Sequence, residues 1–106
     1  MGWKFWNTGD DTTDAERGTS FHMTVEDVFT ITGRGTAVTG AIAAGDVRRG
    51  QKILFADASG QPRSTTVTGI EMARALRQEA HAGDKVGLFL KGVTKADVAA
   101  GAELWA

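Results

Sequence analysis

Cysteine is absent from this sequence, and proline occurs only once in its 106 residues. Without cysteine there is no disulfide framework, no thiolate zinc site and no cysteine nucleophile. No apolar run approaches the ~18 residues that a membrane-spanning helix needs, and the start lacks the apolar stretch of a secretory signal. We therefore expect a cytoplasmic protein that has no membrane partner.

An excess of positive charge is also missing, because 12 basic residues stand against 13 acidic ones and the net charge is -1. Four acidic residues fall within the first 18 positions, which leaves the rest of the chain almost neutral. A protein that binds nucleic acid by neutralising phosphates usually carries a dense stripe of lysine and arginine. We expect no DNA binding, and any contact with RNA has to be local and specific.

Catalytic and nucleotide-binding motifs are incomplete. Residues 35–40 have the G-x-x-x-x-G spacing of a phosphate-binding loop, but Ala41 and Ile42 follow where Lys and Ser or Thr are needed. The TKAD stretch, residues 94–97, is read more simply as a short turn capped by Thr94. His22 and His81 are isolated and are expected to be solvated. The sequence thus predicts no enzyme activity, no cofactor, no metal and no bound GTP.

Alternation with a period of two residues dominates the chain. In residues 21–31 one side of an extended segment carries the apolar residues, and a bulge near Glu26 and Asp27 accounts for the one break in the alternation. The residues predicted on that apolar side are Phe21, Met23, Val25, Phe29 and Ile31. After a glycine turn at residues 33–35, further strands are expected near 37–42, 52–56, 64–72, 86–91 and 103–105. Six or so short strands separated by turns predict an all-β fold, a small closed barrel.

One segment leaves two interpretations open. Residues 70–80, IEMARALRQEA, contain good helix formers, and Met72 and Leu76 have the i, i+4 spacing of a helix face. Propensity alone leaves a helix and an extended segment equally open.

Three blocks carry a family resemblance: VEDVFTITGRGTAVTGAI, then GIEMARAL, then AGDKVGLFLKGVTKADVAAGAELWA. In order and spacing they resemble domain 2 of elongation factor Tu, the barrel that follows the GTPase domain in translational GTPases. The resemblance implies a closed six-stranded antiparallel Greek-key barrel over residues 20–106, preceded by a separate segment, residues 1–19. It favours an extended chain after GIEM, and it implies a free-standing, non-catalytic module linked to translation.

In that family the barrel receives the aminoacylated 3′ end of tRNA, so the resemblance implies a two-sided site. The adenine side would comprise Ile31, Gly33, Ala37, Phe89, Glu71 and Arg74, and the amino-acid side Glu26, Asp27, Phe29 and Thr39. Alternation also predicts that Phe89 points outward, together with Lys85 and Gly87. The sequence departs from the family at three of these positions. Lys85 stands in place of an asparagine, Ala37 in place of a valine, and Phe89 in place of a smaller aliphatic residue.

A second functional interpretation comes from the N-terminal aromatics. Trp3, Phe5 and Trp6 lie in one short segment, which precedes a polar and acidic stretch. Together with Arg34 they are candidates for contact with a partner protein, and Trp105 is a candidate neighbour. A protein-docking or regulatory barrel that has lost RNA binding is therefore the alternative to recognition of aminoacyl-tRNA.

Overall fold

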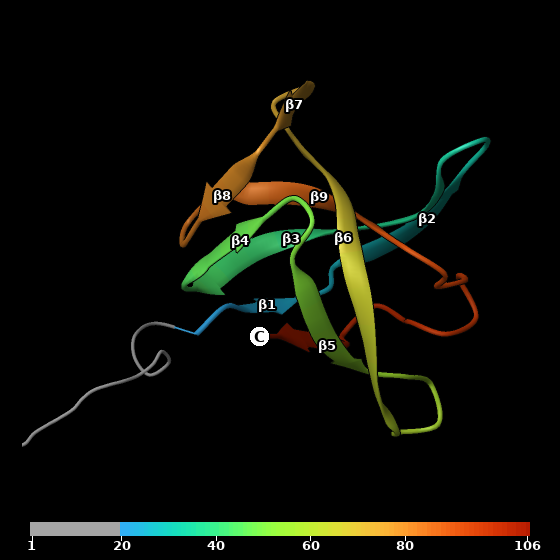
Figure 1. The fold of residues 1–106 in the computed structure, drawn as a ribbon. Coiled ribbons are helices and arrows are strands. Elements are labelled where there is room, and N and C mark those ends of the chain that lie inside the picture. Colours follow the sequence, from blue (N-terminus) through green and yellow to red (C-terminus); the bar gives the residue numbers. More distant parts are fainter. Residues whose placement is uncertain (1–19) are drawn as a thin grey trace, which may run out of the picture.

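A computed structural model of the protein describes residues 20–106, which form ten β-strands (Figure 1). Within these residues no helix is long and apolar enough to cross a membrane. In chain order the strands are β1 (His22–Thr24), β2 (Asp27–Ile31), β3 (Gly35–Ala44), β4 (Asp46–Arg48), β5 (Lys52–Ala56), β6 (Pro62–Met72), β7 (Ala75–Arg77), β8 (Glu79–His81), β9 (Lys85–Leu90) and β10 (Glu103–Trp105).

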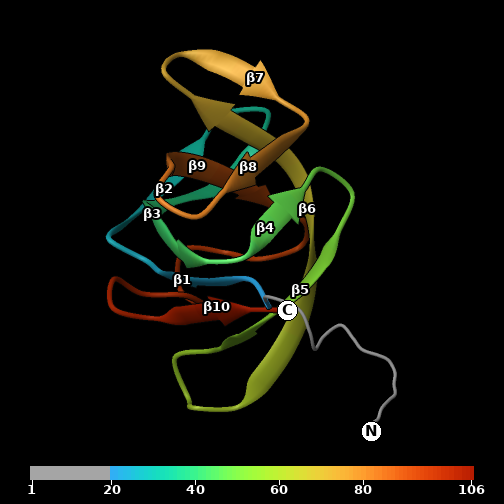
Figure 2. The ribbon, with the colours of Figure 1, turned by 90° about the vertical axis from the view of Figure 1, so that its left-hand side faces the viewer.

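Six of the strands close into an antiparallel barrel. They follow one another in the order β1, β10, β5, β6, β9 and β3, and β3 pairs back onto β1 to complete the ring. Figure 2 shows β1 and β10 side by side near the C-terminus. Strand β2 extends the ring along β3, β7 extends it along β6, and β4 pairs separately with β8. The predicted all-β, closed six-stranded fold is confirmed.

The core is made by the inward side of each strand. On β5, for example, Ile53 and Phe55 are fully buried, whereas Leu54 between them faces outward. On β9 Val86, Leu88 and Leu90 point inward, as the alternation predicts. Burial of such side chains contributes about 1.5–3 kcal/mol each and is the main force that holds the barrel closed.

The break between β1 and β2 corrects one prediction. Val25 is buried, but after the irregular residues 25–26 the inward side passes to Val28, which packs against the core. Phe29 and Ile31 therefore lie on the outer face and are 48% and 38% exposed. The bulge near Glu26 was predicted, but its effect on the orientation of the later residues was not. One extra residue moves every later side chain of the strand to the opposite face.

Residues 70–80 are extended, so the helical interpretation is wrong and the resemblance was the better guide. Strands β6 and β7 form a tight hairpin in which Met72 pairs with Ala75 and Glu71 pairs with Leu76. The sheet register therefore overrides the helix propensity of this segment, as tertiary context often does.

The TKAD turn also differs in detail from its prediction. Asp97 Oδ2 accepts hydrogen bonds from the Thr94 amide at 2.9 Å and from the Thr94 hydroxyl at 3.0 Å. Asp97 Oδ1 lies 3.1 Å from Arg63 Nη1. The bonds from Thr94, with a smaller contribution from Arg63, lower the pKa of Asp97. The carboxylate of Asp97 thus caps the turn, and it is paired rather than free in solvent.

Candidate functional site

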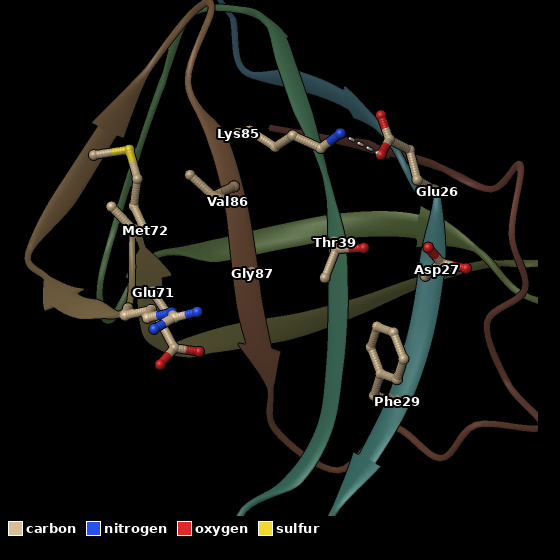
Figure 3. A pocket seen from close by; sticks show the side chains of 11 residues that line it. Glu26, Asp27, Phe29, Thr39, Glu71, Met72, Lys85, Val86 and Gly87 are labelled. Carbon is tan, nitrogen blue, oxygen red and sulfur yellow. Dashed lines mark ion pairs between the residues drawn. The ribbon is translucent and has the colours of Figure 1, made fainter.

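A pocket of about 490 Å³ opens on the outer face of the barrel, where β2, β3, β9 and β6 lie side by side (Figure 3). This volume is within the range of small-molecule sites. Its walls come from segments far apart in the sequence: Glu26, Asp27, Phe29 and Thr39 on one side, Glu71, Met72, Ala73 and Arg74 on the other, and Lys85, Val86 and Gly87 between them.

The floor of the pocket is Gly87. In the register of the sheet it lies between Thr39 on β3 and Glu71 on β6. An added Cβ at this position would stand 3.9 Å from Thr39 Cγ2, which is ordinary contact, so the position is not crowded. Glycine here leaves open a space that a larger side chain would fill.

The rim beside Glu71 is the turn that joins β6 to β7. Its two central residues, Ala73 and Arg74, have φ of 53° and 67°. Positive φ at both central positions is the requirement of a type I′ hairpin turn, which normally selects Asn-Gly. A non-glycine residue in this conformation costs roughly 1–2 kcal/mol. The chain thus bears backbone strain at a position that keeps Arg74 on the pocket rim.

Charges of both signs surround the pocket. Three carboxylates (Glu26, Asp27 and Glu71) face two cations (Arg74 and Lys85). Lys85 Nζ lies 3.2 Å from Glu26 Oε1, across one edge of the opening (Figure 3). With one cation neutralised by a carboxylate, the site has a net negative character that suits a ligand with an ammonium group.

The other half of the predicted site lies outside this pocket. Ile31, Gly33, Ala37 and Phe89 do not line it, although Glu71 and Arg74 do. Phe89 points away from the core, as predicted, but it is only 6% exposed. The guanidinium carbon of Arg34, a predicted partner contact, lies 4.1 Å from the centroid of the Phe89 ring. Of the residues predicted for the adenine side, Glu71 and Arg74 thus line the open pocket, whereas Phe89 is covered by Arg34.

The two histidines are exposed, but each faces a carboxylate, which corrects the prediction that they are simply solvated. His22 Nε2 contacts Glu103, which also accepts a hydrogen bond from Thr24. His81 Nδ1 lies 2.8 Å from Asp46 Oδ1, across the β4–β8 pair. The hydrogen bond to Asp46 raises the pKa of His81. Neither histidine lines the pocket.

Three of the predicted partner contacts, Trp3, Phe5 and Trp6, lie outside the described residues. Trp105, their candidate neighbour, is half-buried on β10 beside Leu54.

Sequence reasoning missed five pocket residues as site members: Met72, Ala73, Lys85, Val86 and Gly87. Alternation predicted that Lys85 and Gly87 point outward. The same alternation could have identified them as candidate site residues on the outer face, beside Thr39. The turn at Ala73 had no local signal, since neither glycine nor asparagine marks it.

The comparison with protein families agrees with the fold. Residues 35–104 match the family model for elongation factor Tu domain 2. The matched residues include Thr39, Glu71, Arg74 and Gly87 of the pocket, as well as the Phe89 position. Because the match covers most of the chain, this protein belongs to the elongation factor Tu domain 2 family.

Proposed function

We propose that this barrel is a non-catalytic binding module, linked to translation, whose outer pocket holds the aminoacylated 3′ end of a tRNA. The observation that carries the proposal is the pocket itself. It brings the four residues predicted for the amino-acid side together with Glu71 and Arg74 from the adenine side. These residues come from three strands, from the break before β2 and from a turn, and the family to which the chain belongs supports the translation link.

The chemistry of the walls suits an aminoacyl ester. Its α-ammonium group would lie near Glu26 and Asp27, and Phe29 would contact an apolar amino-acid side chain. Glu71 can accept a hydrogen bond from a ribose hydroxyl, and Arg74 can pair with a phosphate. This division of roles requires no proton transfer and no nucleophile, so the proposed activity is binding alone.

The expected affinity is low. A stacked base contributes ~1–3 kcal/mol, whereas a millimolar dissociation constant already needs about 4 kcal/mol. With a net charge of -1, the chain gains little from general attraction to RNA. The proposal therefore includes a second surface, from another protein or chain, that holds the rest of the tRNA, and it implies a cytoplasmic location.

The test is an NMR titration of ¹⁵N-labelled protein with an amide-linked, hydrolysis-resistant analogue of 3′-aminoacyl adenosine, compared with adenosine alone. We expect shifts at Asp27, Thr39, Gly87 and Arg74 that depend on the aminoacyl group. Glu71→Gln should weaken binding, whereas Glu79→Gln, at an exposed residue of β8 outside the pocket, should not. If the folded protein shows no shifts with the acylated analogue at millimolar concentration, the proposed function is wrong.

Protein docking is a second candidate function, and one observation favours it. Leu54, which is 38% exposed, and the half-buried Trp105 are cross-strand neighbours on strands that do not line the pocket. Such a surface suits an apolar segment of a partner protein. The protein-docking hypothesis also assigns Trp3 and Trp6 to partner contact. Leu54→Thr and deletion of residues 1–18 test this role. Unchanged stability, solubility and partner binding in both variants would exclude it.

A further inference from the structure

Phe89 has an unusual environment for an outward-facing residue. Its side chain points away from the core of the barrel, yet it is only 6% exposed, as buried as Val93 of the core. On one side its strand neighbour is Ala37 and on the other it is Gly69. Both neighbours are small, so they leave a shallow seat in which the ring lies.

The seat fits the ring closely. A Cβ built at Gly69 would stand 3.3 Å from Phe89 Cδ1, so even alanine would press on the ring. Ala37 is buried as well, at 6% exposure. The small residues on both sides thus compensate for the large side chain in the middle, and the ring presents one face outward.

That outward face is covered by Arg34. Its guanidinium carbon lies 4.1 Å from the ring centroid, well within the range of a cation–π contact. Arg34 belongs to the exposed turn between β2 and β3, and it stands between Gly33 and Gly35, which have φ of 80° and 90°. The glycines carry the special backbone geometry of this turn, so no strain ties the Arg34 side chain to one position.

We propose that Arg34 closes a base-stacking site on Phe89, and that a nucleobase binds there only by displacing the guanidinium group. A planar base and a planar guanidinium compete for the same face, because both interact with the π surface of the ring. The stack therefore regulates access to the adenine side, while the neighbouring pocket stays open. The identity of the ligand, a 3′-terminal adenosine, rests on the proposed function, but the closure by Arg34 rests on the Phe89 geometry alone.

The experiment compares adenosine binding to the wild-type chain and to Arg34→Ala by NMR titration. Adenosine is neutral, so the lost positive charge does not affect the comparison. We expect Arg34→Ala to bind adenosine about twofold to fivefold more tightly than the wild type does. This is the effect of removing one exposed cation–π contact that competes with the base. Arg49→Ala, at another exposed arginine, should leave the affinity unchanged.

A second variant identifies the surface that receives the base. Arg34→Ala combined with Phe89→Leu keeps an apolar side chain on β9 but removes the aromatic face, so the gain in affinity should disappear. The ring-current shifts of the Arg34 side-chain protons in the wild-type chain should also collapse when adenosine binds. Equal affinity of wild type and Arg34→Ala, or a gain that survives Phe89→Leu, would overturn the proposal.

This outcome is separable from that of the proposed function. If acylated and deacylated analogues bind equally but Arg34→Ala still binds adenosine more tightly, the aminoacyl role fails and the closure by Arg34 stands. If the acylated analogue shifts the signals of Asp27 and Thr39 but Arg34→Ala binds adenosine no more tightly than the wild type, the aminoacyl role stands and the closure by Arg34 fails.

Discussion

Lys85 Nζ lies 3.2 Å from Glu26 Oε1, and this ion pair spans one edge of the pocket opening. The Lys85 side chain is 73% exposed, so the pair is well solvated and contributes little to folding. Its importance is local, because it neutralises one of the carboxylates that would face the ammonium group of the proposed ligand.

The first prediction concerns this pair. Lys85→Gln should change the free energy of unfolding by less than about 1 kcal/mol. It should strengthen binding of an aminoacyl analogue with a free α-amino group, because Glu26 is then no longer neutralised. Titrations with the free and the N-acetylated analogue measure the effect, and Lys52→Gln on β5 is the control for net charge. An equal gain for both analogues would argue against the role assigned to Glu26.

The second prediction concerns the strained turn at the pocket rim. Asparagine tolerates positive φ better than alanine, so Ala73→Asn should raise the free energy of unfolding by about 1 kcal/mol. Binding should be unchanged because Arg74 remains in place. Adding Arg74→Gly completes an Asn-Gly turn, and this double variant should be at least as stable but bind the acylated analogue more weakly. Urea denaturation gives the free energy of unfolding, and the NMR titration gives the affinity for the acylated analogue. A stable double variant that binds with full affinity would show that Arg74 does not contact the ligand.

Two glycines near each other in the sheet provide the third prediction. A Cβ at Gly40 would overlap the backbone carbonyl oxygen of Thr24, where β1 and β3 approach closely. We expect Gly40→Ala to cost about 1–3 kcal/mol of stability. At Gly87 a Cβ meets no atom closer than 3.9 Å. Gly87→Ala should therefore preserve stability or raise it by about 0.5–1 kcal/mol, as alanine does in a strand interior.

The same substitution tests the pocket, since a methyl group at Gly87 would rise from its floor. Binding of the acylated analogue should weaken in Gly87→Ala and weaken further in Gly87→Val. Gly40→Ala reports only on stability. Full affinity in a folded Gly87→Val variant would show that the ligand lies elsewhere.

The fourth prediction is a pH dependence at the β4–β8 pair. The hydrogen bond to Asp46 raises the folded-state pKa of His81 above its usual value of 6.5, and Glu79 and Asp84 add to the shift. A raised pKa means that folding favours the protonated form. The stabilisation is therefore fully present below pH 6.5 and is lost as the pH rises through the folded-state pKa.

Asp46→Asn should remove most of this dependence, because the hydrogen bond to Asp46 is the largest cause of the raised pKa. Denaturation midpoints should be measured across the neutral pH range. The wild type should have a higher midpoint than Asp46→Asn at the lower pH values, and this difference should shrink as the pH rises. NMR titration of the His81 ring gives the pKa directly. A constant difference between the two proteins at every pH would contradict the assignment.

The sequence by itself determined the architecture of this protein. Alternating apolar residues and glycine-marked turns placed strands such as 52–56 and 103–105 at their observed bounds, because both signals act over a few residues. The motif blocks predicted the family, and with it an extended rather than helical chain after the GIEM block. These features depend on local backbone preference and side-chain patterning, which a sequence displays directly.

The tertiary structure alone decided which side chains meet. The bulge after Val25 moved Phe29 and Ile31 to the outer face, and cross-strand register placed Gly87 between Thr39 and Glu71. The stack of Arg34 on Phe89 joins a turn to a strand more than fifty residues later. Such contacts are fixed by register and by the closure of the barrel, which are properties of the whole chain. For that reason the sequence could name candidate site residues but could not reveal that some of them line an open pocket while Phe89 is covered by Arg34.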